Sequence, residues 1–228
     1  MIIESILQTD LYKMTMQWFV LYHYPEVDVE YTFNNRNKNM KFTQEAVDEI
    51  QEEINLMETL RLTDEEHDFI RDTLPFLPVT YRQYLAAYRF NPNQIKMWLD
   101  QDDQLQITIK GKWRDTILLE VCLMAIISEV YFKMVDTDWN MDGQIEQARA
   151  KAKALSDAGC TFADFGTRRR RNAETQQIIV ETMKQYKGFV GTSNPYLAMK
   201  NNPIPINIIA TTFSIITLFD ISSFTPFG

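Results

Sequence analysis

Thr161 to Asn194 read TFADFGTRRRRNAETQQIIVETMKQYKGFVGTSN, and the rhythm of this segment predicts the architecture of the second half of the chain. Short β-rich runs at 161–165 and 188–191 flank a helical pattern at about 172–186. Another predicted helix, at about 142–157, ends at Gly159, whose position suits a helix C-cap. Alternation of this kind is typical of parallel sheets and α/β barrels, so we predict that βα units begin here.

The residues before about 138 follow a different pattern, in which the predicted helices and strands do not alternate regularly. Periodicity predicts helices at about 10–23, 43–60 and 81–88, and a long, strongly apolar helix at 117–135. The predicted strands cover 27–34, 95–99 and 105–110. Thr63 and Glu66 have the spacing of a capping box that opens one more helix. This mixture predicts an α+β fold.

We therefore divide the chain into three parts. Residues 1–138 form the predicted N-terminal α+β domain, and residues 139–206 form the predicted start of an α/β barrel domain. Residues 207–228 are predicted to be a divergent apolar tail. The run IPINIIATTFSIITLF at 204–219 is shorter than the ~20 residues that span a bilayer as a helix, and its β-branched content favours a strand.

Composition excludes several classes of protein. The 228 residues carry 23 Lys plus Arg against 31 Asp plus Glu, a formal net charge of −8. An acidic chain is a poor candidate for a general nucleic-acid binder or for docking on anionic membranes. Cys122 and Cys160 lie in apolar sequence, so we expect two buried thiols and a reducing, cytoplasmic compartment. The N-terminus has no pattern of a signal peptide, and no Cys/His cluster has metal-ligand spacing.

Four consecutive arginines, Arg168 to Arg171, follow a predicted strand at the end where α/β sheets bind ligands. A guanidinium group presents paired donors that suit phosphate or carboxylate oxygens, so the run predicts an anion site. The alternatives are a solvated basic patch or structural ion pairs with the excess carboxylates. Four neighbours cannot all face one pocket, so we expect two to point inward, either Arg168 with Arg170 or an adjacent pair.

Two other motifs bear on this site. Gly191-Thr-Ser-Asn194 closes the next predicted strand, and its hydroxyl and amide groups suit either a phosphate cradle or an ordinary helix N-cap. Because both motifs follow neighbouring parallel strands, they would face one opening. Tyr12 lies early in the first predicted helix, where packing against the domain is the ordinary role and ligand contact the alternative.

Taken together, five motifs resemble the nicotinate phosphoribosyltransferase family over about residues 5 to 205. They are TDLYKMTM at 9–16, YTFNNR at 31–36, GKWRDTILLEVCLMAIISE at 111–129, FADFGTRRRR at 162–171 and FVGTSNPYLA at 189–198. The resemblance implies an α+β domain followed by an irregular α/β barrel that is incomplete in this chain. It also implies a reaction of nicotinate with phosphoribosyl pyrophosphate, coupled to ATP hydrolysis and using Mg²⁺, in a homodimer that serves NAD salvage.

The same resemblance implies roles for particular residues. Tyr12 would stack on the pyridine ring of nicotinate, and Phe165 would cover the ring from the other side. Arg168 and Arg169 would neutralise the nicotinate carboxylate or the departing pyrophosphate. The resemblance also implies that Thr192, Ser193 and Asn194, in the FVGTSNPYLA motif, bind the substrates.

The chain departs from the family pattern near its C-terminus. The family's Gly-Thr-x-Ala-His motif, which carries the phosphorylated histidine, does not occur in the sequence, so we name no catalytic residue. A truncated or frameshifted reading frame after about residue 205 is the expected explanation. The alternative to an enzyme is an inactive fragment or a non-catalytic module that dimerises or binds nucleotides.

Overall fold

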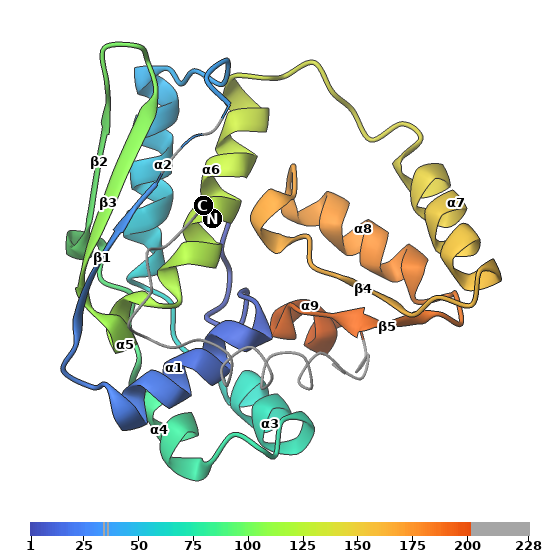
Figure 1. Ribbon diagram of the computed structural model, residues 1–228, viewed down its shortest axis with the longest axis horizontal. Helices are drawn as coiled ribbons and strands as arrows, with labels where there is room; N and C mark the ends of the chain where they lie inside the picture. The colour runs from blue at the N-terminus through green and yellow to red at the C-terminus, as the bar shows by residue number, and fades with distance from the viewer. Residues whose placement is uncertain (34, 36, 202–228) are drawn as a thin grey trace.

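An antiparallel sheet and a set of helices form the N-terminal half of the protein (Figure 1). The computed structural model describes residues 1–33, 35 and 37–201. The elements of this half are α1 (Leu11–His23), β1 (Asp28–Thr32), α2 (Gln44–Met57), α3 (Asp64–Thr73), α4 (Val79–Ala87), a 3₁₀ turn (Pro92–Gln94), β2 (Ile95–Leu99), β3 (Leu105–Lys112), α5 (Trp113–Thr116) and α6 (Leu119–Met134).

The three strands pair antiparallel in the order β1-β3-β2, with β3 in the centre. Leu105, Ile107 and Ile109 alternate along β3 and point to one buried face, which is the period-2 pattern of a half-buried strand. Helix α2 packs beside β2, and α6 packs on α2, so the sheet and these two helices enclose the core (Figure 1).

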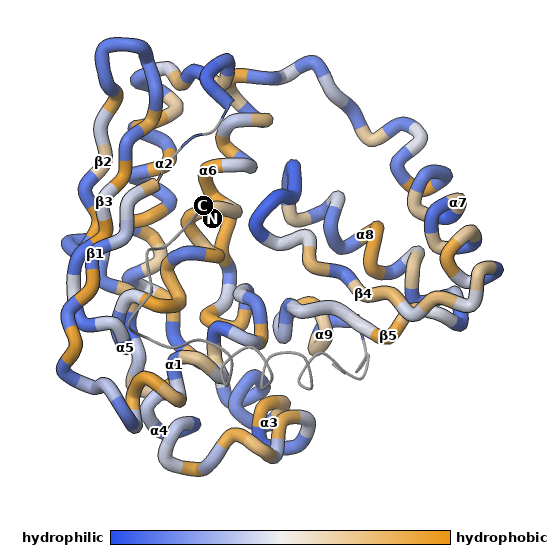
Figure 2. The backbone as a smooth tube through the Cα atoms, viewed as in Figure 1, coloured by the Kyte–Doolittle hydropathy of each residue, from blue (hydrophilic) through white to orange (hydrophobic). Residues whose placement is uncertain are grey.

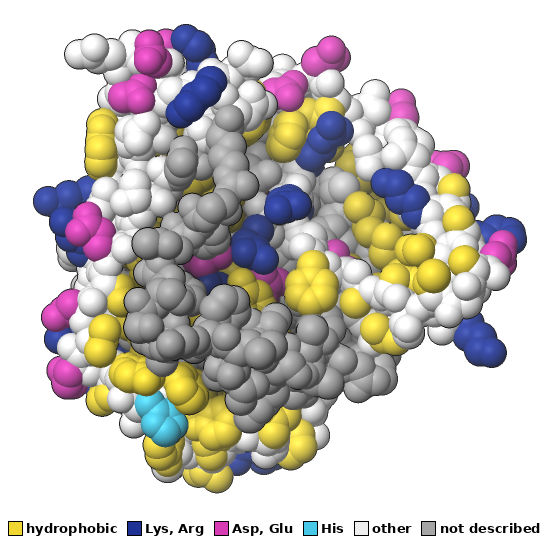
Figure 3. Space-filling model, viewed as in Figure 1, with side chains coloured by type: hydrophobic (Ala, Val, Ile, Leu, Met, Phe, Trp, Pro, Cys, Tyr) yellow, Lys and Arg dark blue, Asp and Glu magenta, His cyan; other side chains and the backbone are white. Residues whose placement is uncertain are grey.

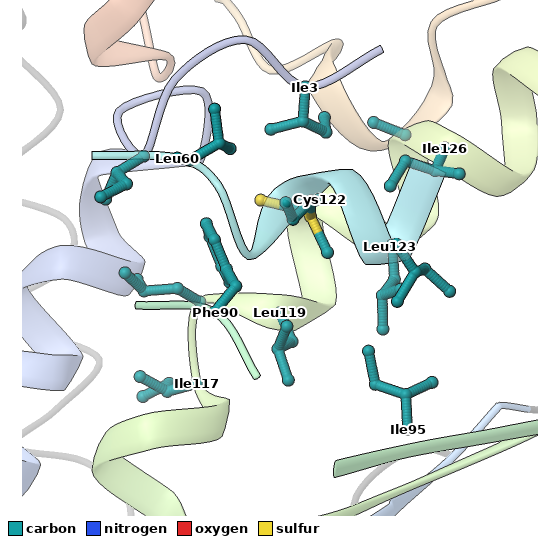
Figure 4. Packing of buried hydrophobic residues seen from close by; sticks show 14 of the residues in the cluster. Ile3, Leu60, Phe90, Ile95, Ile117, Leu119, Cys122, Leu123 and Ile126 are labelled. Atoms are coloured by element: carbon teal, nitrogen blue, oxygen red, sulfur yellow. The ribbon is translucent and has the colours of Figure 1, made fainter. Parts of the chain in front are cut away.

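Helix α6 is the centre of this core, as its apolar sequence predicts. Leu119, Cys122, Leu123 and Ile126 on this helix are almost inaccessible to solvent, and Figure 4 shows them among apolar side chains from other segments of the chain. Figure 2 shows the contrast with α7 on the other side of the molecule, where hydrophilic residues alternate with hydrophobic ones. Burial of this kind contributes roughly 1.5–3 kcal/mol per large apolar side chain.

Parallel βα units make up the rest of the described chain, as predicted. Their elements are α7 (Gln144–Asp157), β4 (Phe162–Asp164), the 3₁₀ turn η2 (Thr167–Arg169), α8 (Ala173–Met183), β5 (Phe189–Thr192) and α9 (Pro195–Lys200). Strands β4 and β5 pair parallel. Gly191 has a φ of 141°, a conformation that glycine adopts without strain, and it lies where β5 approaches its turn.

The predicted local signals are largely confirmed. The capping box of Thr63 and Glu66 is present at the start of α3, and Gly159 follows α7 with a φ of 70°, which suits a helix end. One expectation about the thiols is wrong: Cys122 is buried, but Cys160 is exposed, because it lies in the turn between α7 and β4 rather than within the strand.

Some predictions fall outside the described residues. These are the strand expected at 204–219, the divergent tail at 207–228, and the part of the YTFNNR motif at positions 34 and 36. Within the residues that the structure does describe, no helix is both long enough and apolar enough to cross a bilayer.

Candidate functional site

A buried carboxylate organises the carboxyl ends of β4 and β5. Asp164 Oδ2 accepts hydrogen bonds from Thr192 Oγ1 at 2.7 Å and from Gln176 Nε2 at 3.0 Å, and Asp164 Oδ1 accepts one from the Gly166 amide at 2.9 Å. A Cβ at Gly166 would lie 2.8 Å from Asp164 Oδ1, so glycine allows the turn to close over the carboxylate. Asp164 therefore fixes the turn that precedes the arginines.

The two turns after these strands are also joined directly. Asn194 Nδ2 donates to Thr167 Oγ1 at 3.0 Å, while Asn194 Oδ1 accepts from the Leu197 amide at 3.1 Å and so caps α9. Thr167 and Asn194 are both fully buried. The predicted alternative of N-cap chemistry for this motif is thus observed, and the same side chain ties the η2 turn to the β5 turn.

The start of α1 docks on the same place. The Leu11 amide donates to the Ser193 carbonyl at 2.7 Å, and Ser193 Oγ donates to Asp10 Oδ1 at 2.6 Å. Asp10 and Ser193 are each 1% exposed. Residues more than 180 positions apart in the sequence are thereby held together, and the first turn of α1 lies beside the carboxyl ends of the parallel strands.

Arg168 reaches from η2 into this junction between three elements. Its Nε lies 3.4 Å from Asp10 Oδ2, and its Nη1 donates to Glu120 Oε1 at 3.0 Å. The other oxygen of Glu120 accepts from Lys13 Nζ, which has no other hydrogen-bond or ion-pair partner among the described residues. Two cations and two carboxylates therefore form one chain of ion pairs that links α1, α6 and η2.

The Tyr12 ring lies within this cluster. The Arg168 guanidinium carbon is 5.9 Å from the ring centroid and Lys13 Nζ is 5.3 Å from it, both within cation–π range. Burial, with the nearby Glu120 carboxylate, raises the pKa of the Tyr12 hydroxyl well above its usual value, so the side chain is neutral at physiological pH. Burial likewise raises the pKa of Asp10, while Ser193 and Arg168 lower it.

The other three arginines face different surroundings. Arg169 is exposed, and its side chain has no ion pair or hydrogen bond within the described part of the chain. Arg170 is buried: its Nε lies 3.5 Å from Glu129 Oε2, and its Nη2 donates to the Ile2 carbonyl at 3.1 Å. The Arg171 guanidinium lies 5.0 Å from the centroid of the Phe132 ring.

Phe165 precedes the arginines and is 47% exposed. Figure 3 shows basic and acidic side chains close together near the middle of this face of the molecule. An exposed ring that closely precedes the arginines in the sequence is available to cover a flat ligand, and its own packing contributes little to the core.

The structure thus brings together most of the residues that the sequence singled out. Tyr12, Arg168 and Ser193 lie in or beside one ion-pair cluster. Thr192 and Asn194 bond to Asp164 and Thr167, in the strand and turn that precede Arg168. The side chains of Thr192, Ser193 and Asn194 are buried and used within the protein, so their direct contact with a ligand stays a prediction.

Sequence reasoning did not single out Asp10, Glu120 or Asp164. Asp10 is the N-cap residue of α1, but its side chain makes no capping hydrogen bond and pairs with Ser193 and Arg168 instead. Glu120 belongs to an apolar helix whose plain interpretation is core. Glu120 and Glu129 are the two carboxylates of this largely apolar helix, and they were the available signal, because burial of a charge requires a partner.

Comparisons with known proteins agree on one family. A family model described as the nicotinate phosphoribosyltransferase (NAPRTase) N-terminal domain matches residues 7–128, and one described as the NAPRTase family matches residues 160–216. The second match therefore includes the first ten residues of the segment that was expected to diverge.

Individual relatives carry the same description. A Schizosaccharomyces pombe protein named "Probable nicotinate phosphoribosyltransferase" is 43% identical over 209 residues, which cover 88% of this chain and 51% of the relative. A nicotinate phosphoribosyltransferase of Methanosarcina mazei is 36% identical, with 91% and 55% covered. The crystal structure of nicotinate phosphoribosyltransferase from Porphyromonas gingivalis superposes with a TM-score of 0.84 at 33% identity, with 89% and 52% covered. The chain spans about half the length of each relative.

Proposed function

Because this chain belongs to the nicotinate phosphoribosyltransferase family, we propose that it binds nicotinate and phosphoribosyl pyrophosphate and joins them. The products would be nicotinate mononucleotide and pyrophosphate, in a step of NAD salvage coupled to ATP hydrolysis. The matched relatives are about twice as long, so the activity, the substrates and the partners are all part of the proposal.

The observation that carries this proposal is the position of Arg168 beside the Tyr12 ring, at the carboxyl end of parallel strands. A flat aromatic anion can stack on a tyrosine ring while its carboxylate pairs with a guanidinium group. Nicotinate has both features. Nicotinamide lacks the charge, so the same geometry favours the acid over the amide.

Phosphoribosyl transfer passes through a cationic, oxocarbenium-like state at the ribose carbon, with negative charge growing on the departing pyrophosphate. The protein mainly has to hold two reactants in line and stabilise that charge. Arg168 can pair with the carboxylate of nicotinate, and Arg169, which is exposed, is available to the pyrophosphate group of phosphoribosyl pyrophosphate. Phe165 can shield the bound ring from water.

Mg²⁺ is expected from the family resemblance, and direct ligation of the ion would require carboxylate oxygens that are free to bind it. Asp10, Glu120 and Asp164 each use both oxygens in pairs with other protein groups. Magnesium prefers oxygen ligands that are free to complete an octahedron. These three side chains therefore do not fit as direct ligands, and we assign no step to the ion here.

The proposal is tested by calorimetric titration of nicotinate and of pyrophosphate, combined with a pyrophosphate-release assay with and without ATP. We expect nicotinate to bind, and Arg168→Ala to weaken this by at least about tenfold, since a charged hydrogen bond contributes roughly 1.5–3 kcal/mol. Unchanged affinity in that variant would contradict the assignment. Binding without turnover would support the second candidate, a ligand-binding module, over an enzyme.

We further propose that the protein is a cytoplasmic homodimer, as the family resemblance implies. Analytical ultracentrifugation over a range of concentrations measures the association state, and a monomer at all concentrations would contradict the dimer.

A further inference from the structure

Glu120 has an unusual place in the site, because it is shared by two cations that differ in their exposure to solvent. Its Oε1 accepts from Arg168 Nη1 at 3.0 Å, and its Oε2 pairs with Lys13. The Lys13 side chain is 9% exposed, whereas those of Arg168 and Glu120 are 34% and 23% exposed. The contact between Glu120 and Arg168 is thus on the more accessible side of the cluster.

The donors of Arg168 are not equally available. Its Nε faces Asp10 Oδ2, and its Nη1 is bonded to Glu120, while Nη2 has no partner among the residues described. A planar oxyanion binds a guanidinium group best through two parallel N–H donors. The pair at the outer end of the group is Nη1 with Nη2, so such an anion must take Nη1 from Glu120.

Asp10 is not the carboxylate that yields. It is 1% exposed and is held by Ser193 Oγ at 2.6 Å, at the start of a helix that is itself bonded to the β5 turn. Glu120 can yield, because Lys13 still pairs with it after Arg168 is released. The exchange therefore leaves no buried charge without a partner. An unpaired buried charge is what usually makes breaking such a pair costly.

We propose that Glu120 is an internal competitor for the anion site: its carboxylate occupies Arg168 and is displaced onto Lys13 when the ligand's oxyanion binds. This inference rests on the proposed function, and it assigns to Glu120 the role of setting ligand affinity rather than of contacting the ligand. It makes an unusual prediction, because loss of this ion pair strengthens binding instead of weakening it.

The test is calorimetric titration of sodium nicotinate and of inorganic pyrophosphate into the full chain at fixed ionic strength, with thermal unfolding of each variant measured in parallel. We expect Glu120→Gln to bind at least one of the two anions about fivefold more tightly than the wild type, the effect of one modest ion pair.

Glu49→Gln is the matched control. Glu49, on α2, also forms an ion pair with a cation, Lys133, which lies near the opposite end of α6 from Glu120. The Glu49 side chain is 25% exposed, close to the 23% of Glu120. It removes the same single negative charge. Affinity within twofold of wild type is expected for this variant, which separates local competition from an effect of net charge.

Equal or weaker binding by Glu120→Gln, with an unfolding temperature close to wild type, would show that Glu120 only supports the site and would overturn the inference. If that variant unfolds early, Glu120→Asp keeps the negative charge but shortens the reach of the carboxylate, so its contact with Arg168 is weakened. The same gain is expected for it, and a loss would overturn the inference as well.

Failure of the inference and failure of the proposed function give different results. Wild-type binding that Arg168→Ala abolishes, with no gain in Glu120→Gln, refutes only the competition. Binding that is insensitive to Arg168→Ala, or no binding by any variant, refutes the proposed site and the inference together.

Discussion

Arg170 and Arg169 are neighbours in the sequence, and the structure predicts opposite consequences for their removal. Arg170 is 4% exposed and ties three segments together through the Ile2 carbonyl, Glu129 on α6 and Gln176 on α8. Arg169 is exposed, and its side chain bonds to no described residue. Each change to alanine removes one positive charge, so the pair forms its own control.

The cost of Arg170→Ala follows from the group it leaves behind. Burial already raises the pKa of Glu129, and Arg170 is the main cation that lowers it. Breaking a buried ion pair from one side costs about 3–5 kcal/mol. At roughly 2–4 °C per kcal/mol for a chain of this size, unfolding should begin about 6–20 °C earlier. Arg169→Ala should change stability by less than about 0.5 kcal/mol.

Thermal unfolding followed by circular dichroism, together with urea titration, measures both variants. Adding Glu129→Gln to Arg170→Ala should restore part of the loss, because an amide carries no charge that needs a partner. Equal unfolding temperatures for Arg169→Ala and Arg170→Ala would refute the reasoning, since they would show that burial of the guanidinium group does not decide its role.

Three further predictions concern the backbone, the thiols and a buried acid. Gly188→Ala should be strongly destabilising in urea titration, because the added Cβ would lie 2.4 Å from the Cys160 carbonyl oxygen. Gly159→Ala is the comparison: Gly159 has a φ of 70°, but an added Cβ would have no neighbour within 4 Å. We therefore expect this variant to lose only the roughly 1–2 kcal/mol of backbone strain. A thiol reagent should label Cys160 at once and Cys122 only on unfolding, since Cys122 is buried and burial raises its pKa to about 12; rapid labelling of both in the native protein would contradict the described packing. Burial also raises the folded-state pKa of Asp10 above 3.8, so the native state holds the proton more tightly than the unfolded state does. Its contribution to stability is therefore present below that value and is lost as pH rises through the folded pKa. In urea titrations between pH 3 and 7, this fall should appear in the wild type and be absent from Asp10→Asn.

The sequence by itself determined the order and kind of the elements. Hydrophobic periodicity located α1, α6 and the three antiparallel strands to within a few residues, and the βα rhythm correctly predicted that β4 and β5 would be parallel. These signals are local: the period of a helix or strand, a cap or a turn residue depends on neighbours within about one helical turn. Local chemistry also placed Arg168 at the carboxyl end of a strand.

Only the tertiary structure decided what each arginine does. Arg168 pairs with Asp10 and Glu120, which are 158 and 48 positions away, and Arg170 pairs with Glu129. Four identical residues in a row carry no local signal that distinguishes them. Their roles are set by which buried carboxylate the packing of α1 and α6 brings within reach, because a charge taken out of water is stable only beside a partner.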